Sequence, residues 1–199
     1  MFGSPAFGRI LKKTRCIMNN IWFTADTHFG HESIIKYCSR PFSSSEEMDS
    51  VMIDNWNSVV GEKDTVYFLG DFTLKNKVFA DKTFSMLNGR IYVMRGSHDS
   101  WMDSKDIFPI SLTDSCYLIP PLYSLETNEI PELTTPKGSL PIVLCHYSMR
   151  VWDRSHYGSF HLFGHSHGNL IGSPRSMDVG VDTHNFFPYH IDEVVSMLK

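Results

Sequence analysis

The sequence contains few cysteines and no long hydrophobic run. Its four cysteines are scattered, and none shows the Cys-x-x-Cys spacing of a thiolate zinc site or of a disulfide framework (Cys16, Cys38, Cys116 and Cys145). We therefore predict a reducing, cytoplasmic location. No apolar run approaches the roughly 20 residues that a membrane helix needs, so we expect no association with membranes. Residues 1–18 also lack the uninterrupted apolar segment of a secretory signal.

An excess of basic residues is also missing. The 199 residues include 18 Lys and Arg against 22 Asp and Glu, a formal net charge of −4. Four basic residues precede the first acidic residue, Asp26, so residues 19–199 carry 14 basic against 22 acidic side chains, a net charge of −8. Bulk binding of nucleic acid needs a basic face, and we expect none here. We predict a basic extension over residues 1–18 and a single domain over residues 19–199, because 42% hydrophobic residues suffice for one core.

Short apolar runs separated by helical patterns predict an α/β fold. Seven runs are typical of buried strands (21–25, 66–69, 91–94, 116–119, 142–145, 160–163 and 177–181). A helix is expected to begin near residues 43–47, since apolar side chains recur at helical spacing from residue 48 to residue 59. Further helices are predicted at about 77–87 and at 191–198. The proline-rich stretch 120–138 predicts an exposed loop or hairpin. The early alternation of strands and helices, followed by a β-richer half, favours one α/β domain.

Five of the predicted strands are followed almost only by Asp, His, Ser and Gly. The five segments are Asp26-Thr27-His28, Gly70-Asp71, Gly96-Ser97-His98-Asp99, His146, and Gly164-His165-Ser166-His167-Gly168. In open α/β sheets, ligands bind beyond the carboxyl ends of the strands. A single histidine after a strand is usually structural, but five such segments together predict a metal site.

The donor types indicate which metals and which chemistry to expect. Carboxylates combined with neutral imidazoles suit Mn²⁺, Fe²⁺ or Zn²⁺ better than Mg²⁺, which prefers oxygen ligands. There are too many donors for one tetrahedral ion, and a carboxylate such as Asp71 can bridge two ions. Two divalent cations, the carboxylates of Asp26 and Asp71, and one bridging hydroxide leave a net charge of about +1, which suits a phosphate ester. His98 lies beside these positions, and Asp99 could orient its ring or raise its pKa so that it protonates the leaving alcohol.

In this order, the segments resemble the signature of the calcineurin-like metallophosphoesterase superfamily, from about residue 21 to residue 182. The Asp26–His31 opening, Arg40-Pro41-Phe42, Trp56-Asn57 and Gly180-Val181-Asp182 resemble the small bacterial and phage phosphoesterases of that superfamily. The resemblance implies a four-layer αββα sandwich with two central mixed sheets flanked by helices. It also implies a metal-dependent phosphodiesterase or phosphomonoesterase, in which a hydroxide activated by two metal ions attacks phosphorus and His98 acts as general acid.

The same resemblance implies a set of metal ligands. One ion would be held by Asp26, His28, Asp71 and His167, and the other by Asp71, residue 97, His146 and His165. The family has Asn where this chain has Ser97, whose hydroxyl is one bond nearer to the backbone. We therefore expect a weakened second metal site.

Other residues are candidates for substrate contacts. His31 could face the substrate, support a ligand or lie at the surface, and Arg95 and Arg150 could bind phosphate oxygens or form ordinary ion pairs. Trp152, in the run from residue 147 to residue 157, could stack on a substrate ring or pack in the core. We expect Asp182 and His184 to hold other residues in place rather than to react.

Two further classes of function remain open at this stage. One is a regulatory metal-binding domain that has lost catalytic power through Ser97, and a more distant one is a nucleic-acid-binding module. The residues do not distinguish a monoester, a diester, a cyclic nucleotide or a nucleic-acid end as substrate, nor do they indicate an oligomeric state.

Overall fold

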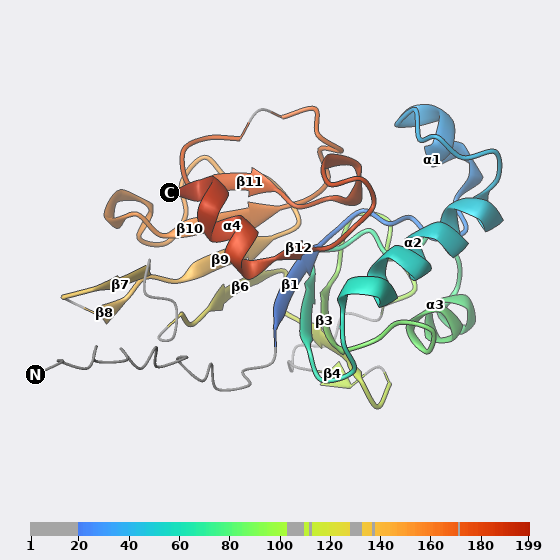
Figure 1. The fold of residues 1–199 in the computed structure, drawn as a ribbon, viewed down its shortest axis with the longest axis horizontal. Coiled ribbons are helices and arrows are strands. Elements are labelled where there is room, and N and C mark those ends of the chain that lie inside the picture. Colours follow the sequence, from blue (N-terminus) through green and yellow to red (C-terminus); the bar gives the residue numbers. More distant parts are fainter. Residues whose placement is uncertain (1–19, 103–109, 112, 128–132, 137, 171) are drawn as a thin grey trace, which may run out of the picture.

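The computed structural model describes residues 20–102, 110–111, 113–127, 133–136, 138–170 and 172–199 (Figure 1). The predicted extension over residues 1–18 lies outside this part of the chain. Six of the predicted strands form within a residue of their expected bounds: β1 (Ile21–Thr24), β2 (Thr65–Phe68), β3 (Arg90–Met94), β5 (Cys116–Ile119), β9 (Ile142–Cys145) and β10 (Phe160–Phe163).

The strands form two mixed sheets. The first has six strands in the order β12-β1-β2-β3-β5-β4, in which β1, β2, β3 and β5 are parallel, while β4 (Ile110–Ser111) and β12 (Tyr189–His190) run antiparallel at the edges. The second has the order β11-β10-β9-β6, with β6 (Leu122–Leu125) antiparallel to β9 and β11 (Ser176–Asp178) parallel to β10. A hairpin of β7 (Thr134–Thr135) and β8 (Gly138–Ser139) stands apart.

Helices flank these sheets. Helix α2 (Ser45–Val59) begins where the sequence predicted, because the Ser44 side chain accepts a hydrogen bond from the Glu47 N–H at 3.1 Å. Helix α3 (Lys77–Phe84) ends three residues earlier than expected, and α4 (Ile191–Leu198) has its predicted bounds. The sequence did not predict α1 (Glu32–Tyr37). Two short 3₁₀ helices follow β9 and β11, namely η2 (Ser155–Tyr157) and η3 (Val181–Thr183).

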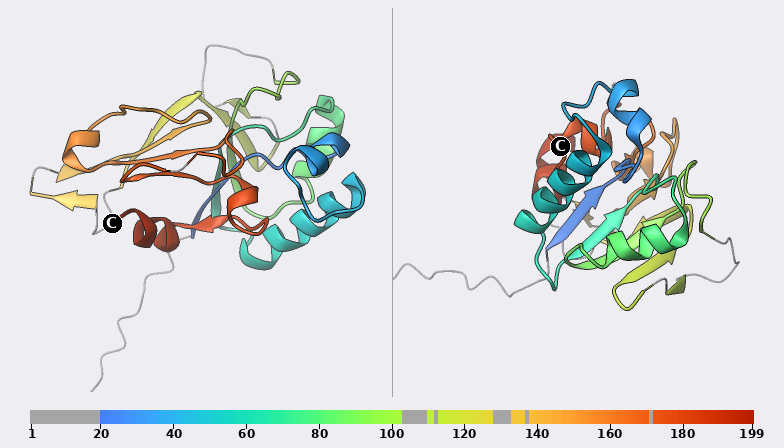
Figure 2. Two further views of the ribbon diagram at one scale, coloured as in Figure 1. Left: turned by 90° about the horizontal axis from the view of Figure 1, so that it is seen from above. Right: turned by 90° about the vertical axis from the view of Figure 1, so that its right-hand side faces the viewer.

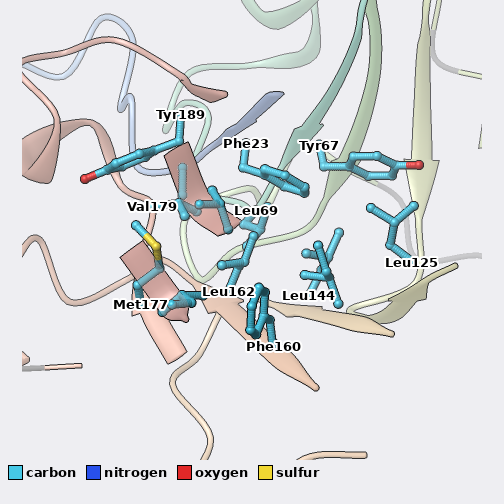
Figure 3. Close-up of a cluster of buried hydrophobic side chains, with 14 of the residues drawn as sticks. Phe23, Tyr67, Leu69, Leu125, Leu144, Phe160, Leu162, Met177, Val179 and Tyr189 are labelled. Carbon is cyan, nitrogen blue, oxygen red and sulfur yellow. The ribbon is translucent and has the colours of Figure 1, made fainter. Parts of the chain in front are cut away.

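Two apolar clusters separate these layers. One lies between the sheets, where Phe23, Tyr67 and Leu69 of the first sheet face Leu144 and Leu162 of the second (Figure 3). Helix α4 packs on the same cluster. The other cluster lies between the six-stranded sheet and helices α1 to α3, which cover its outer face (Figures 1 and 2). The predicted sandwich of two mixed sheets flanked by helices is therefore confirmed.

Some expectations about individual elements were met only in part. The segment 120–138 was predicted to be an exposed loop or hairpin. It contains β6, whose antiparallel pairing with β9 agrees with the hairpin alternative and completes the second sheet; residues 128–132 and 137 lie outside the described part. The run predicted at 177–181 ends as a strand at Asp178 and continues into η3. No helix in the described ranges is long and apolar enough to cross a membrane.

Candidate metal centre

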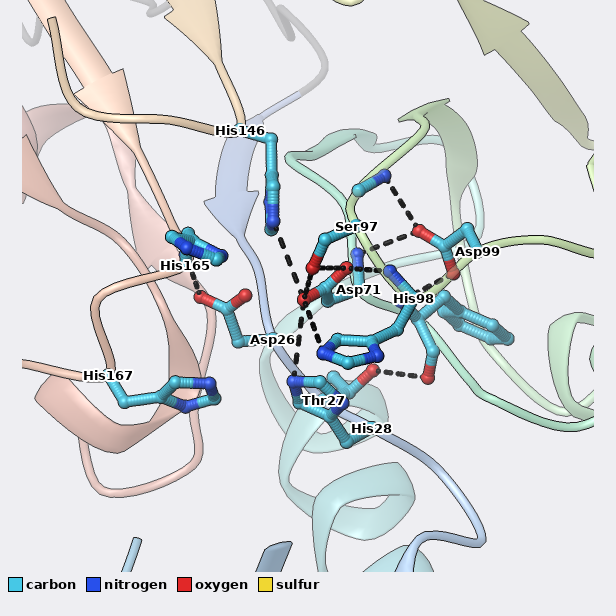
Figure 4. Close-up of polar contacts among 12 residues, drawn as sticks. Asp26, Thr27, His28, Asp71, Ser97, His98, Asp99, His146, His165 and His167 are labelled. Carbon is cyan, nitrogen blue, oxygen red and sulfur yellow. Dashed lines mark hydrogen bonds and ion pairs between the residues drawn. The ribbon is translucent and has the colours of Figure 1, made fainter. Parts of the chain in front are cut away.

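The carboxyl ends of β1, β2, β3, β9 and β10 bring the predicted donors together (Figure 4). Three groups of three side chains each have ligand atoms within 4.8 Å of one another: Asp26, His28 and His167 in the first group, Asp71, His146 and His165 in the second, and Cys38, His167 and Asp182 in the third. The six residues of the first two groups were all predicted ligands. These two groups differ from the two implied metal sites in two respects: Asp71 belongs to the second group only, and Ser97 belongs to neither.

Asp71 lies near the centre of the site and faces both groups (Figure 4). Its Oδ2 atom is 3.4 Å from Nε2 of His146 and 3.7 Å from Nε2 of His28. A carboxylate that bridges two cations has to lie between the other ligands of the two ions. Asp71 therefore has the position that a bridging ligand requires.

Buried polar atoms without hydrogen bonds are concentrated in this site. Within the described part of the chain, six such side-chain atoms occur, and four of them belong to predicted ligands: Oδ1 of Asp26, both ring nitrogens of His28, and Nε2 of His146. Buried polar groups are nearly always satisfied, and each exception costs about 1–3 kcal/mol. Coordination to cations would satisfy Oδ1 of Asp26, Nε2 of His146 and one ring nitrogen of His28, since a neutral imidazole offers a single nitrogen lone pair, so these residues fit a metal centre.

Burial and neighbouring charges shift the pKa values of the site residues in different directions. Burial raises the pKa of Asp26 to about 7 and lowers the pKa of His28 to about 3. Burial also opposes ionisation of Asp71, but the His146 ring and the His98 backbone N–H outweigh it and hold the pKa of Asp71 below its usual range. These shifts favour neutral His28 and ionised Asp71, which are the protonation states that bind metals, whereas the raised pKa values of Asp26, His146 and His167 favour protonated forms from which a cation would displace the proton.

Backbone strain is stored at the predicted ligands. Five of the ten non-glycine residues with positive φ in the described ranges are ligands of the two groups: Asp26 (58°), His28 (51°), Asp71 (60°), His165 (66°) and His167 (48°). Such conformations are costly and cluster at functional sites. Gly164 lets the β10 turn approach closely, since a Cβ there would lie 2.7 Å from Oδ2 of Asp26.

Further hydrogen bonds orient the ligands. Nδ1 of His146 lies 2.7 Å from the Leu69 carbonyl oxygen, which can only accept, so Nε2 presents its lone pair to the site. Nδ1 of His167 donates in the same way to Oδ2 of Asp182 at 2.7 Å. Both ring orientations leave one nitrogen free to bind a metal.

Behind Asp182 stands Arg40, a residue whose role the sequence did not reveal. The Arg40 guanidinium donates to both carboxylate oxygens of Asp182 at 2.8 Å, and to the carbonyl oxygens of Asp26 and Thr27. Arg40 and Asp182 are 142 residues apart, so no local pattern could have revealed the pair. The expectation that Asp182 holds other residues in place agrees with this geometry. His184 instead stacks on the Tyr189 ring and contacts Phe187 and Glu193.

The predicted contact between Asp99 and the His98 ring is not made. Asp99 is fully buried, and its oxygens accept hydrogen bonds from the backbone N–H groups of residues 71, 72, 73 and 96 and from the Trp101 indole. A carboxylate with this many donors ties the β2 and β3 ends together. Asp99 therefore shapes the backbone of the site instead of orienting the His98 ring.

Ser97 and His98 lie on the open side of the site. The Ser97 hydroxyl donates to Oδ2 of Asp71 at 3.0 Å, so it contacts the carboxylate that was predicted to bridge the two ions. His98 is 46% exposed, with Nε2 4.0 Å from the same oxygen and its ring centroid 5.3 Å from that of His28. This places an accessible imidazole directly beside both groups of ligands.

The four residues predicted to contact substrate lie in different environments. The His31 ring centroid lies 5.7 Å from that of His28, and burial lowers the pKa of His31. Arg95 and Arg150 are exposed and form no hydrogen bond or ion pair with any residue that the structure describes. Trp152 is 9% exposed, and its indole N–H donates to the Ser159 carbonyl at 3.2 Å. Trp152 is thus packed in the interior and is not a stacking surface.

Comparison with known proteins finds relatives but no activity. No family model matches. The chain is 54% identical over 86 residues to an uncharacterized protein of Methanocaldococcus jannaschii, covering 42% of this chain and 49% of that protein. It is 36% identical over 85 residues to the Gene 66 protein of Mycobacterium phage L5, covering 41% of each. The chain thus spans about half the length of these two relatives or less.

Two other matches cover nearly the whole chain. The Gene 66 protein of Mycobacterium phage D29 is 26% identical over 209 aligned residues, covering 92% of this chain and 97% of that protein. A crystal structure of a protein of unknown function from Aquifex aeolicus is 22% identical, covers 90% of this chain and 100% of its own, and has a TM-score of 0.64. This likeness shows a shared fold.

Proposed function

We propose that the chain is a dinuclear metal-dependent hydrolase of phosphate esters. The observation that carries the proposal is the pair of three-residue ligand groups on either side of the Asp71 carboxylate. The unpartnered atoms of Asp26, His28 and His146 support it, because a binding site for cations explains why buried polar groups were left without hydrogen bonds.

The donor set also supports a choice of metal. Four imidazoles and two carboxylates favour Mn²⁺, Fe²⁺ or Zn²⁺ over Mg²⁺. Two such ions supply a water of lowered pKa and a positive clamp for phosphate oxygens. The substrate would be a phosphate ester, and a nucleotide is among the candidates.

The chain's own residues supply the rest of the chemistry. His98 is accessible and adjacent to both ligand groups, so a protonated His98 ring can donate to the oxygen of the departing alcohol. Asp182 and the Leu69 carbonyl hold His167 and His146 in the tautomer that binds metal. Asp99 fixes the two strand ends that carry Asp71 and His98.

A regulatory metal-binding domain is the alternative. Ser97 favours it, because the hydroxyl donates to Asp71 in the position where a fourth ligand of the second ion would stand. The exposed His98 favours the enzyme, because a site that only stores metal has no use for a proton donor on its open side. Metal binding without turnover would support the alternative.

The test uses the metal-loaded protein and a chromogenic phosphodiester. With Mn²⁺, the wild type should bind two ions and release nitrophenolate, while Asp71→Ala should lose tight binding of both ions and all turnover. Asp81→Ala, which removes an exposed carboxylate of α3, is the control and should change neither. Full metal content in Asp71→Ala, measured by mass spectrometry of the dialysed protein, would show that Asp71 does not bridge the ions.

A reducing cytoplasmic location remains part of the proposal. The described cysteines, Cys38, Cys116 and Cys145, are all free thiols. Fractionating the native cells and measuring the thiol content of the protein in each fraction tests this point.

A further inference from the structure

An exposed aromatic ring lies against the second group of ligands. Tyr147 directly follows His146, and its ring centroid is 4.8 Å from the rings of both His146 and His165, edge-on in each case. Tyr147 is nevertheless 49% exposed, and its hydroxyl has no hydrogen-bond partner among the described residues. A large aromatic side chain that is half in solvent beside two predicted ligands is available to bind something else.

The open side of the site has two distinct flanks. His98 packs against His28 of the first group, whereas Tyr147 packs against His146 and His165 of the second. His165 is the exposed member of the second group, so the Tyr147 ring borders the part of the site that solvent reaches. A phosphoryl group above Asp71 would therefore have His98 on one flank and Tyr147 on the other.

We propose that Tyr147 stacks on a planar ring in the non-leaving group of the substrate, so that the preferred substrate is a phosphodiester with an aromatic or nucleoside substituent. The proposal rests on the proposed function. His98 would protonate the leaving oxygen, so the leaving group lies on the side of His98. The other substituent of phosphorus then lies on the side of Tyr147. A base or aryl ring can lie on the exposed face of the tyrosine, because aromatic faces stack with little dependence on ring identity.

Stacking uses the aromatic face of Tyr147 and does not require its hydroxyl group. Loss of the ring should weaken binding of a planar substituent roughly tenfold, by the usual size of base–aromatic stacking. Tyr147→Phe keeps the ring and should retain this binding, whereas Tyr147→Leu keeps bulk and apolarity without the aromatic face. Tyr157→Leu is the matched control, since Tyr157 is a 62% exposed tyrosine in η2 whose ring packs on His156.

The experiment compares two diesters with the same leaving group. Thymidine 4-nitrophenyl phosphate and methyl 4-nitrophenyl phosphate both release nitrophenolate and differ only in the non-leaving substituent. With the Mn²⁺-loaded protein, Tyr147→Leu should lower kcat/KM about tenfold for the thymidine ester, mainly through KM, and leave the methyl ester unchanged. Tyr147→Phe and Tyr157→Leu should behave like the wild type with both substrates.

Binding measured without turnover keeps the inference separate from the proposed hydrolysis. Calorimetry with thymidine monophosphate and with methyl phosphate should show tighter binding of the nucleotide to the wild type and to Tyr147→Phe, and no preference in Tyr147→Leu. If neither diester is hydrolysed, the proposed activity fails while this binding experiment still decides the role of Tyr147.

Three results would overturn the inference. Equal losses with both diesters would show that Tyr147 only supports His146 and His165. A loss in Tyr147→Phe as large as in Tyr147→Leu would assign the effect to the hydroxyl. Equal binding of thymidine monophosphate and methyl phosphate to the wild type would show that Tyr147 provides no stacking site.

Discussion

Replacing Asp182 by Asn tests how far the metal centre depends on residues that do not touch the metal. In the wild type, Oδ1 and Oδ2 of Asp182 accept hydrogen bonds from Arg40, and Oδ2 also accepts one from Nδ1 of His167. An amide has only one acceptor oxygen. Asp182→Asn would therefore remove the negative charge and set an N–H group against one of the existing donors.

The structure predicts the size of the effect. The Arg40 side chain is 0% exposed and Asp182 is 9% exposed, so the variant leaves a buried guanidinium without its counter-ion. Breaking such a pair costs about 3–5 kcal/mol. The carbonyl oxygens of Asp26 and Thr27 still accept from Arg40, which places the expected loss near 3 kcal/mol, the lower end of that range. Loss of the carboxylate behind His167 should also weaken metal binding about 10- to 100-fold.

The loss of stability should depend on pH in a known direction. Burial opposes ionisation of Asp182, but the hydrogen bonds from His167 and Arg40 outweigh it and hold the pKa of Asp182 below its usual range. A carboxylate with a depressed pKa stabilises the folded state above its unfolded pKa. The difference between wild type and Asp182→Asn in the metal-free protein should therefore shrink as the pH falls through the acidic range.

Two measurements check this prediction. Urea unfolding in the presence of a chelator gives the free energy of unfolding, and calorimetric titration with Mn²⁺ gives the metal affinity. Asp81→Asn is the control, because the Lys77–Asp81 pair is 51% and 38% exposed and should contribute only about 0.3–0.5 kcal/mol. If Asp182→Asn were no more destabilising than Asp81→Asn and bound Mn²⁺ normally, the argument for a charge that orients His167 would be refuted.

Three further predictions concern the ligand groups themselves. His98→Asn should lower hydrolysis of alkyl esters by roughly 100-fold and of nitrophenyl esters far less, at unchanged metal content, because an alkoxide needs a proton and nitrophenolate scarcely does; equal losses would remove its role as general acid. Ser97→Asn should raise affinity for the second Mn²⁺ about tenfold, and the hydrolysis rate with it, because the longer side chain adds a ligand; Mn²⁺ titration followed by hydrolysis decides this. Asp26→Asn should stabilise the metal-free protein increasingly between pH 4 and 7, because burial raises the pKa of Asp26 to about 7 and so penalises its charged form. The same variant should lose the stabilisation that Mn²⁺ gives the wild type. Thermal unfolding with and without Mn²⁺ measures both effects.

The sequence alone determined which segments become buried strands and what their ends carry. Strand signals are local, because β-branched and aromatic residues in a run of four have to be covered on both faces in a parallel sheet. The polar residues after β1, β2, β3, β9 and β10 could therefore be assigned to one region of the fold from the sequence alone. Strand β6 was not predicted as a strand, because its four residues are flanked by prolines. Its place at the edge of the second sheet also depends on pairing with β9, which lies elsewhere in the chain.

Only the tertiary structure decided which residues support the ligands. Arg40 and Asp182 meet across 142 residues, Asp99 bonds backbone amides instead of the neighbouring His98 ring, and Trp152 is buried although the run that contains it leads away from the site. Tyr147 also acquires its position from the meeting of His146 and His165. The predicted metal ligands could be identified from the sequence, because each lies at a strand end and is marked by its residue type and its spacing from its neighbours. Contacts behind and around that set arise from the packing of two sheets against each other, which no local stretch of sequence encodes.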